Sequence, residues 1–208
     1  MYRNKPVIGI VGGIGSGKSY VAKLFGDAGC LVIDSDAQVR AAYHDPTILQ
    51  TLRQWWGGDA FRADGSLDRA AVARKVFADP AERQRLESLV HPWVDARRAA
   101  VMDAAPPDVV AYVWDAPLLV EAGLHERCDA VVFVDAPREE RLRRVMEQRG
   151  WDEGELGRRE NLQLPLDTKR EISDYQVVNT AGADELRGHV RQILSRIITG
   201  LPDRPGQG

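Results

Sequence analysis

A glycine-rich segment near the amino end has the residue types and spacing that bind phosphate groups. It reads Gly12-Gly13-Ile14-Gly15-Ser16-Gly17-Lys18-Ser19 and matches the pattern Gly, any four residues, Gly-Lys-Ser. Glycine lets successive backbone N–H groups point into one concavity, and a helix beginning near Gly17 would add its positive dipole end. The segment therefore predicts a nucleoside triphosphate site formed by Gly13, Gly15, Ser16, Gly17, Lys18, Ser19 and Tyr20.

Three of these residues have distinct expected roles. We expect Lys18 to lie along the β- and γ-phosphates and the Ser19 hydroxyl to take one position around Mg²⁺. Tyr20 is expected to act through its backbone N–H near the α-phosphate. The Gly-x-Gly-x-x-Gly register of dinucleotide-binding folds is absent here. The segment thus favours a triphosphate but does not identify the group that accepts a phosphoryl.

Carboxylates follow two later apolar segments and suggest acid–base or metal chemistry. Asp34 and Asp36 close the second apolar segment, and Arg40 comes one helical turn after Asp36. Asp36 is a candidate to orient or deprotonate an attacking hydroxyl; the alternative is that it caps a helix beginning at Ala37. Arg40 either pairs with Asp36 or faces phosphates of the acceptor. Asp115 is a candidate to position Mg²⁺ through water, or else caps a helix ahead of Pro117.

The apolar segments predict the sheet that positions these groups. They alternate with amphipathic stretches, as in a parallel sheet with crossover helices, and are nearly continuous in apolar character, as in strands covered on both faces. Each ends at Gly, Asp or Asn, at the edge where α/β sheets bind ligands. We therefore predict an α/β fold, a P-loop core with a five-stranded parallel sheet formed by Val7–Val11, Cys30–Ile33, Val109–Trp114, Ala130–Val134 and Tyr175–Val178.

The spacing of these strands is irregular, which predicts insertions. Far more chain separates the second and third strands than one crossover helix needs, and it is helical in pattern over Thr47–Trp56, Asp68–Phe77 and Ala81–Met102. Asp45-Pro46 and Asp79-Pro80 are expected helix starts, with Asp as the cap. We predict a core of residues 1–36, 105–137 and 171–200 and an inserted helical acceptor domain of residues 37–104.

A charged stretch precedes the last strand. Residues 138–170 are rich in both arginine and acidic side chains. One interpretation is a pair of solvated helices with i,i+4 ion pairs; the other is a helical lid that brings arginine onto phosphates. The Gly/Pro-rich residues 201–208 are expected to form a flexible tail.

Overall composition restricts the partners. The net charge is −3, with no basic excess of the kind that predicts a nucleic-acid partner. No segment is long and apolar enough for a signal peptide or a membrane span. Two cysteines are too few for a disulfide framework. We expect a cytoplasmic protein that acts on small molecules.

An ordered set of short motifs carries a family resemblance. After Gly-Lys-Ser and Asp-x-x-x-Arg come Gly65-x-Leu67-Asp68-Arg69, Val76-Phe77, Leu86-Glu87, His91-Pro92, Pro117-Leu118-Leu119-Val120-Glu121 and Asn179. Because it carries these motifs in this order, the chain resembles the dephospho-CoA kinase family. The resemblance implies ATP-dependent phosphorylation of the ribose 3′-hydroxyl of dephospho-CoA, the last step of coenzyme A synthesis, with ATP and Mg²⁺ at the glycine-rich segment.

The resemblance also implies roles for individual residues. Asp36 would be the base for the 3′-hydroxyl and Arg144 would approach the transferring phosphoryl, while His91, Leu118 and Glu121 would lie toward the acceptor. This chain departs from the family pattern at Tyr20, where Thr is common, and at Arg141, where Gln is common.

Two other functions stay open on the residues alone. One is a P-loop kinase for a nucleotide or nucleoside, which should lack the later motifs. The other is a nucleotide-switch protein, which would need Asn-Lys-x-Asp after a strand; Asn-Lys occurs at Asn4-Lys5, upstream of the glycine-rich segment.

Overall fold

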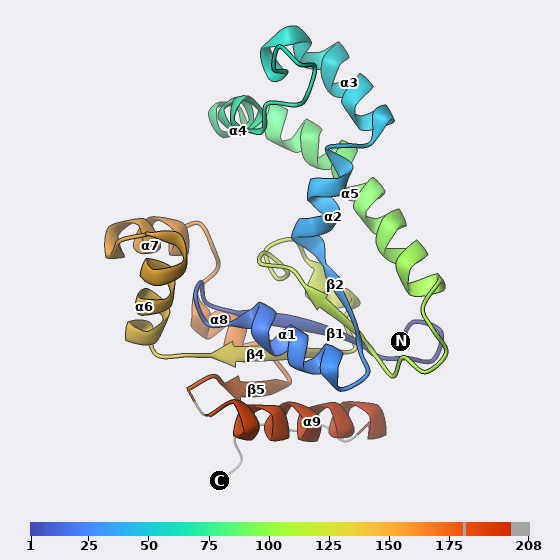
Figure 1. Cartoon of the computed structure of the whole chain (residues 1–208), viewed down its shortest axis with the longest axis vertical. Helices are drawn as coiled ribbons and strands as arrows, with labels where there is room; N and C mark the ends of the chain where they lie inside the picture. Colours follow the sequence, from blue (N-terminus) through green and yellow to red (C-terminus); the bar gives the residue numbers. More distant parts are fainter. Residues whose placement is uncertain (181, 201–208) are drawn as a thin grey trace. The chain divides into compact units, whose positions relative to one another are not determined.

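Five short apolar segments form the strands of one parallel sheet in the computed structural model, which describes residues 1–180 and 182–200. The strand order is β2-β3-β1-β4-β5 (Figure 1). This arrangement confirms the predicted five-stranded parallel sheet. The bounds are β1 Val7–Gly12, β2 Leu31–Asp34, β3 Tyr112–Asp115, β4 Ala130–Asp135 and β5 Tyr175–Val178.

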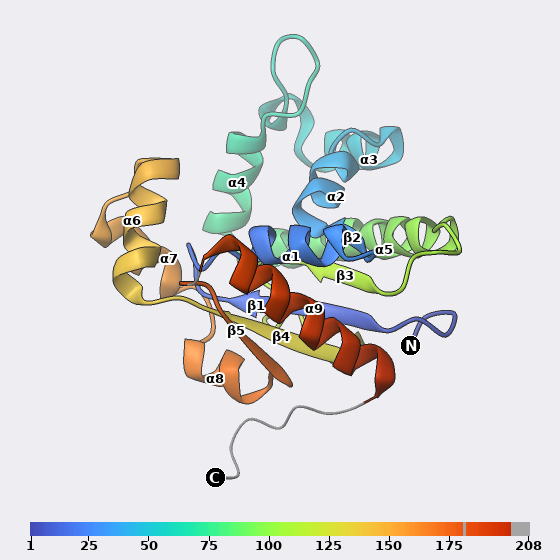
Figure 2. The same ribbon diagram turned by 60° about the horizontal axis from the view of Figure 1, so that its bottom comes forward.

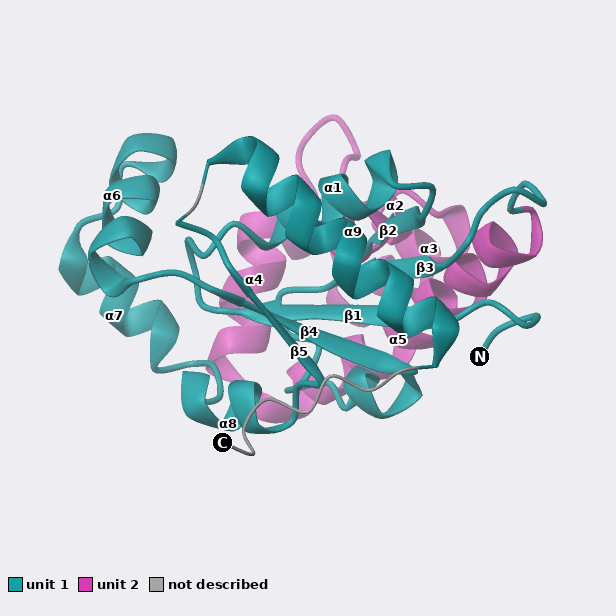
Figure 3. Ribbon diagram, turned by 90° about the horizontal axis from the view of Figure 1, so that it is seen from below, with its two compact units in different colours: residues 1–34, 105–208 teal, residues 35–104 magenta. Residues whose placement is uncertain are grey.

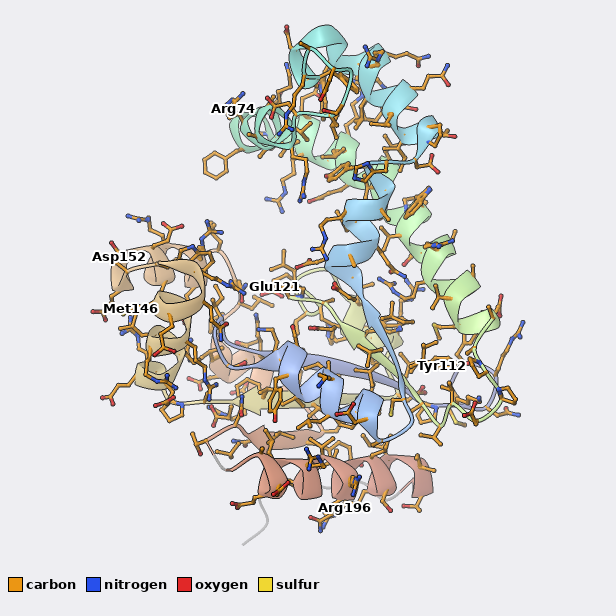
Figure 4. All side chains as sticks on the ribbon, viewed as in Figure 1. Arg74, Tyr112, Glu121, Met146, Asp152 and Arg196 are labelled. Carbon is orange, nitrogen blue, oxygen red and sulfur yellow. The ribbon has the colours of Figure 1, made fainter. Side chains whose placement is uncertain are left out.

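The third strand begins three residues later than the sequence pattern predicts. Val109 N donates to Pro106 O and Val110 N donates to Gly29 O, so these residues form a turn and a loop contact instead of the ladder. Tyr112, labelled in Figure 4, is the first residue of β3 and pairs with Val7 on one side and Leu31 on the other.

Helices cover the sheet and explain its apolar strands. α1 (Lys18–Asp27) and α9 (Ala183–Thr199) pack against each other and against the sheet on one face (Figure 2). The short helix α8 (Leu166–Glu171) contacts β1. Since every residue of β1 is buried, its side chains must be apolar in both directions. The buried core between sheet, α1 and α9 includes Ile8, Ile10, Phe25, Val132, Val177 and Val190.

The charged stretch forms a helical hairpin and then returns to the sheet. α6 (Arg138–Arg149) ends at Gly150, and Asp152 caps α7 (Glu153–Glu160) by accepting from Glu155 N. Surface pairs such as Arg143 with Glu140 and Glu147 lie along α6, as the ion-pair interpretation predicts. The stretch predicted as a lid, 138–170, also includes most of α8, whose Lys169 is 1% exposed. By its contacts α8 belongs with the sheet.

Residues Ser35–Ala104 form a second compact unit, distinct from the unit of Met1–Asp34 and Ala105–Gly208 (Figure 3). The residues expected to form a flexible tail, 201–208, lie outside the described residues. The second unit contains α2 (Ser35–Ala42), α3 (Pro46–Trp56), α4 (Arg69–Ala78) and α5 (Pro80–Asp103) around its own core, which includes Ile48, Leu52, Val72, Val90 and Val94.

Asp side chains set the starts of three of these helices. Asp45 accepts from Thr47 N and Ile48 N, Asp68 accepts from Ala70 N and Ala71 N, and Asp79 accepts from Ala81 N. The predicted starts at Asp45-Pro46 and Asp79-Pro80 are confirmed. The alternative that Asp36 caps a helix beginning at Ala37 is wrong, because α2 begins at Ser35, directly after β2, and places Asp36 inside its first turn. Asp115 likewise precedes turns rather than a helix. Within the described ranges, no helix combines the length and apolar character needed to cross a membrane.

Candidate active site

The glycine-rich loop connects β1 to α1 and is enclosed by side chains. Gly15 and Gly17 have φ values of 77° and 90°, which glycine adopts without steric cost. A Cβ on Gly17 would lie 2.2 Å from Asn179 Nδ2, and one on Gly15 would lie 2.6 Å from the Arg141 carbonyl oxygen. The loop therefore needs glycine at these positions for both conformation and space.

Lys18 spans this loop. It is the first residue of α1, and its Nζ donates to Gly12 O at 3.1 Å and to Gly13 O at 2.8 Å. Burial lowers the pKa of Lys18 from 10.5 to about 8; the positive charge of Lys169 acts in the same direction and Asp115 opposes it. A poorly solvated cation held across a concave loop is suited to an anion with several charges.

The other loop residues divide into buried and exposed groups. Ser16 is fully buried, and its hydroxyl has no hydrogen-bond partner in the described part of the chain. Ser19 and Tyr20 are exposed at the start of α1. Backbone N–H groups in the first turn of this helix have no intrahelical acceptor, so they can bind phosphate oxygens.

Arg144 on α6 contacts the loop from outside. Its Nη1 donates to Gly15 O at 3.3 Å and Ser16 O at 3.1 Å, and its Nη2 donates to Asn179 O at 2.8 Å. Asn179 Nδ2 donates to Ser16 O at 2.8 Å. The structure thus holds Arg144 at the loop through main-chain carbonyl groups.

Two carboxylates stand at the ends of neighbouring strands. Asp115 ends β3 and is 9% exposed; it pairs in register with Ile10 of β1 and with Asp34 of β2. Asp115 is close enough to Lys18 to affect its pKa. No group of three or more metal-binding side chains exists among the described residues. One hydroxyl, Ser19, and one carboxylate, Asp115, fit an ion such as Mg²⁺ that keeps its remaining positions for water and phosphate oxygens.

Glu121 lies in the connection after β3 (Figure 4), and its carboxylate is bound by other groups of the protein. Its Oε1 accepts from Lys169 Nζ at 2.8 Å and from Leu164 N at 3.0 Å. Burial opposes ionisation, but the Lys169 hydrogen bond lowers the pKa of Glu121 below its ordinary value. Leu118 of the same connection is 50% exposed. Sequence reasoning missed Lys169; its signal was the scarcity of lysine in an arginine-rich chain.

A cavity of about 400 Å³ lies beside the loop within the same unit. Gly13 and Ile14 form one wall. The rest is formed by residues of α6, of α7, of the connection to α8 and of the start of α8: Arg141, Glu160, Asn161, Gln163, Leu164, Pro165 and Leu166. The remaining predicted site residues, Asp36, Arg40 and His91, belong to the helical unit, where all three are exposed.

The central strand of the parallel sheet leads into a phosphate loop that carries Lys18, and Arg144 of α6 contacts this loop. Together these features define a P-loop kinase. A family model described as Dephospho-CoA kinase matches residues 6–185. The chain belongs to the dephospho-CoA kinase family. As a kinase of the P-loop class it uses ATP as its phosphoryl donor.

Known proteins agree with this assignment. A Dephospho-CoA kinase of Mycolicibacterium paratuberculosis is 41% identical over 92% of this chain, which spans 47% of that longer protein. One of Anaeromyxobacter dehalogenans is 39% identical over 96% of this chain and 97% of its own length. The crystal structure of TT1252 from Thermus thermophilus has 34% identity and a TM-score of 0.82, covering 92% of this chain and 97% of that chain. The fold is also that of a dephospho-CoA kinase from Campylobacter jejuni, with a TM-score of 0.66 and 19% identity over 94% of this chain and 98% of that chain.

Proposed function

We propose that this chain transfers the γ-phosphoryl group of ATP to the ribose 3′-hydroxyl of dephospho-CoA. The bond between the γ-phosphorus and the bridging oxygen to the β-phosphate breaks, and a bond from the 3′-oxygen to phosphorus forms. The products are ADP and CoA, and the hydroxyl proton leaves to a base. The observation that carries the proposal is the loop spanned by Lys18 at the end of the central strand, in a chain of this family.

The core unit supplies the nucleotide site in this proposal. Gly13 and the residues from Gly15 to Tyr20 hold the phosphates through backbone N–H groups, and Lys18 balances their charge. Mg²⁺, when bound with ATP, neutralises charge on the transferring group, and Ser19 and Asp115 would hold it. Positioning and charge neutralisation supply most of the rate in reactions of this type.

The helical unit supplies the acceptor groups. Asp36 removes the proton from the 3′-hydroxyl, and Arg40 and His91 contact the acceptor, together with Leu118 and Glu121 of the core unit. This division rests on the family motifs that these residues match. The compactness of Ser35–Ala104, with its own apolar core, supports its role as a separate acceptor domain.

The hairpin of α6 and α7 is proposed as the lid. It has a small apolar centre of Val145 and Leu156 packed with Ile14 of the loop, and Arg144 extends from it to the loop. Closure over bound ATP would exclude water and prevent hydrolysis. The charge balance and the low cysteine count agree with a cytoplasmic location, which is part of the proposal.

A coupled ADP-release assay tests the function against dephospho-CoA, adenosine, AMP, CMP and dTMP. We expect acceptor-dependent ADP release with dephospho-CoA alone, and ³¹P NMR of the product should show a new 3′-phosphomonoester. Lys18→Ala should abolish this turnover. Faster reaction with a nucleotide would identify a different kinase, and ADP release independent of every acceptor would rule out the proposed transfer.

A further inference from the structure

The outer side of the phosphate loop presents a row of main-chain carbonyl groups. In a loop whose N–H groups converge on a phosphate, the carbonyls face away and need other donors. Here three consecutive carbonyls accept from side chains. Ile14 O accepts from Arg141 Nη1 at 3.3 Å, Gly15 O and Ser16 O accept from Arg144, and Ser16 O also accepts from Asn179.

Arg141 is the most deeply placed of these donors. It is 5% exposed, and its Nη1 also forms an ion pair with Glu160 at the end of α7. A buried guanidinium without such a partner would be strongly unfavourable. One guanidinium nitrogen therefore connects the phosphate loop to the second helix of the hairpin.

Gly13 shows how closely Arg141 lies against the loop. A Cβ on Gly13 would be 2.8 Å from Arg141 Nη1 and 3.1 Å from Cζ. Gly13 does not have a positive φ, so it is the guanidinium, and not the backbone conformation, that a side chain at this position would displace. Arg141 also lines the cavity beside the loop, and its Nε is buried without a hydrogen-bond partner among the described residues.

We infer that Arg141, held by Glu160, is a positioning residue that fixes the outer side of the phosphate loop in the shape that binds ATP. This inference rests on the proposed nucleotide site. Its physical basis is preorganisation: a loop already held by its carbonyls loses less conformational freedom when its N–H groups bind phosphate. Glu160 acts through Arg141, by neutralising and orienting the guanidinium.

The test is ATP affinity, measured by calorimetric titration of the full chain without acceptor. We expect Arg141→Gln to weaken ATP binding about tenfold and Glu160→Gln to weaken it several-fold. The double variant should bind ATP no more weakly than Arg141→Gln, because both changes remove one linkage. Arg143→Gln is the matched control: it lies on the same helix, is 54% exposed and pairs with Glu140 and Glu147, and its ATP affinity should stay within twofold of the parent.

Two further measurements separate a positioning role from a general structural one. Arg141→Gln loses a buried ion pair and is expected to be less stable than Arg143→Gln, so urea unfolding of the ligand-free protein should show that it is still fully folded under the conditions of the ATP titration. Arg141→Lys should recover only part of the affinity, because Nη1 makes both contacts and the lysine side chain, one atom shorter, places its nitrogen short of that position. ATP binding by Arg141→Gln within twofold of the parent, additive effects of the two changes, or a loss that follows unfolding would overturn the inference. Failure of the parent itself to bind ATP would overturn the proposed function as well.

Discussion

Lys169 and Glu121 form an ion pair that is almost removed from solvent: Nζ lies 2.8 Å from Oε1, and the side chains are 2% and 17% exposed. Lys169 also donates to Gln163 Oε1 at 3.0 Å. With Leu164 N bound to Glu121, this pair attaches the connection between α7 and α8 to the loop after β3. Gln163 and Leu164 in turn line the cavity beside the phosphate loop.

Lys169→Met should destabilise the protein by about 3 kcal/mol, because it leaves the Glu121 carboxylate in a site with little water. Changing both partners, in Lys169→Met with Glu121→Gln, should cost less than the single change. Urea unfolding at pH 7 measures both effects. Because the pKa of Glu121 is lowered in the fold, the stabilisation from its charge is present above the ordinary pKa of glutamate and is lost as the pH falls through the lowered value. Equal stability of the parent and Lys169→Met at pH 7 would contradict this account.

ATP binding at pH 8 should take up protons. With a pKa of about 8, Lys18 is only about half protonated at that pH before ATP arrives. The phosphates favour the charged form and raise this pKa again, so roughly half a proton per ATP should be taken up. Calorimetry in buffers of different ionisation enthalpy measures the uptake. Lys18→Arg, which stays charged, is the control and should show none; equal uptake in both proteins would assign the proton to another group.

The same lowered pKa affects stability without nucleotide. Between pH 8 and 10.5 the unfolded chain holds more protons at Lys18 than the folded protein does. The contribution of this group to the free energy of unfolding therefore rises with pH across that window. The Lys18→Met protein should lack this rise in a series of urea unfolding curves. A pH dependence unchanged by the substitution would mean that the folded Lys18 titrates normally.

Asp36→Asn and Asp115→Asn should impair different steps: the first should slow phosphoryl transfer, and the second should raise the Mg²⁺ requirement. Asp36→Asn removes the proposed base, so single-turnover transfer should slow by a factor of about 10² to 10⁴ while ATP binding persists. Asp115→Asn should instead raise the Mg²⁺ concentration needed for half-maximal rate, because an amide is a weaker ligand for hard cations and their bound water. Rapid-quench transfer and a Mg²⁺ titration separate the two. An unchanged transfer rate in Asp36→Asn would remove it from the role of base.

Arg144→Ala should lower kcat more than it lowers ATP affinity, if its donors turn from the loop to the transferring phosphoryl during reaction. Its present partners are three carbonyl oxygens, of Gly15, Ser16 and Asn179. Steady-state kinetics and direct ATP titration on one preparation give the two values. A loss confined to ATP affinity would place Arg144 with Arg141, as a support of the loop.

Local patterns were sufficient for the parts of the fold that local physics determines. The strands follow from apolar runs, the phosphate loop from glycine spacing, and the starts of α3 and α5 from Asp-Pro pairs. The alternative that Asp36 caps a helix was wrong because nothing local marks a helix that begins directly at a strand end. The contacts of Arg141 with Ile14 and of Lys169 with Glu121 could not be predicted from local sequence, because they join residues 127 and 48 positions apart. They depend on how the hairpin of α6 and α7, and then α8, return to the sheet.

The strand order has a consequence for synthesis on the ribosome. β1 lies at the centre of the sheet, yet its partners, β3 and β4, begin at Tyr112 and Ala130. In the growing chain, β1 therefore has no strand to pair with until all of Ser35–Ala104 has been synthesised. During that time the helical unit can fold around its own apolar core. The strand that leads into the glycine-rich loop is made early but gains its neighbouring strands late, so during translation its apolar side chains are open to association with other chains or with a chaperone.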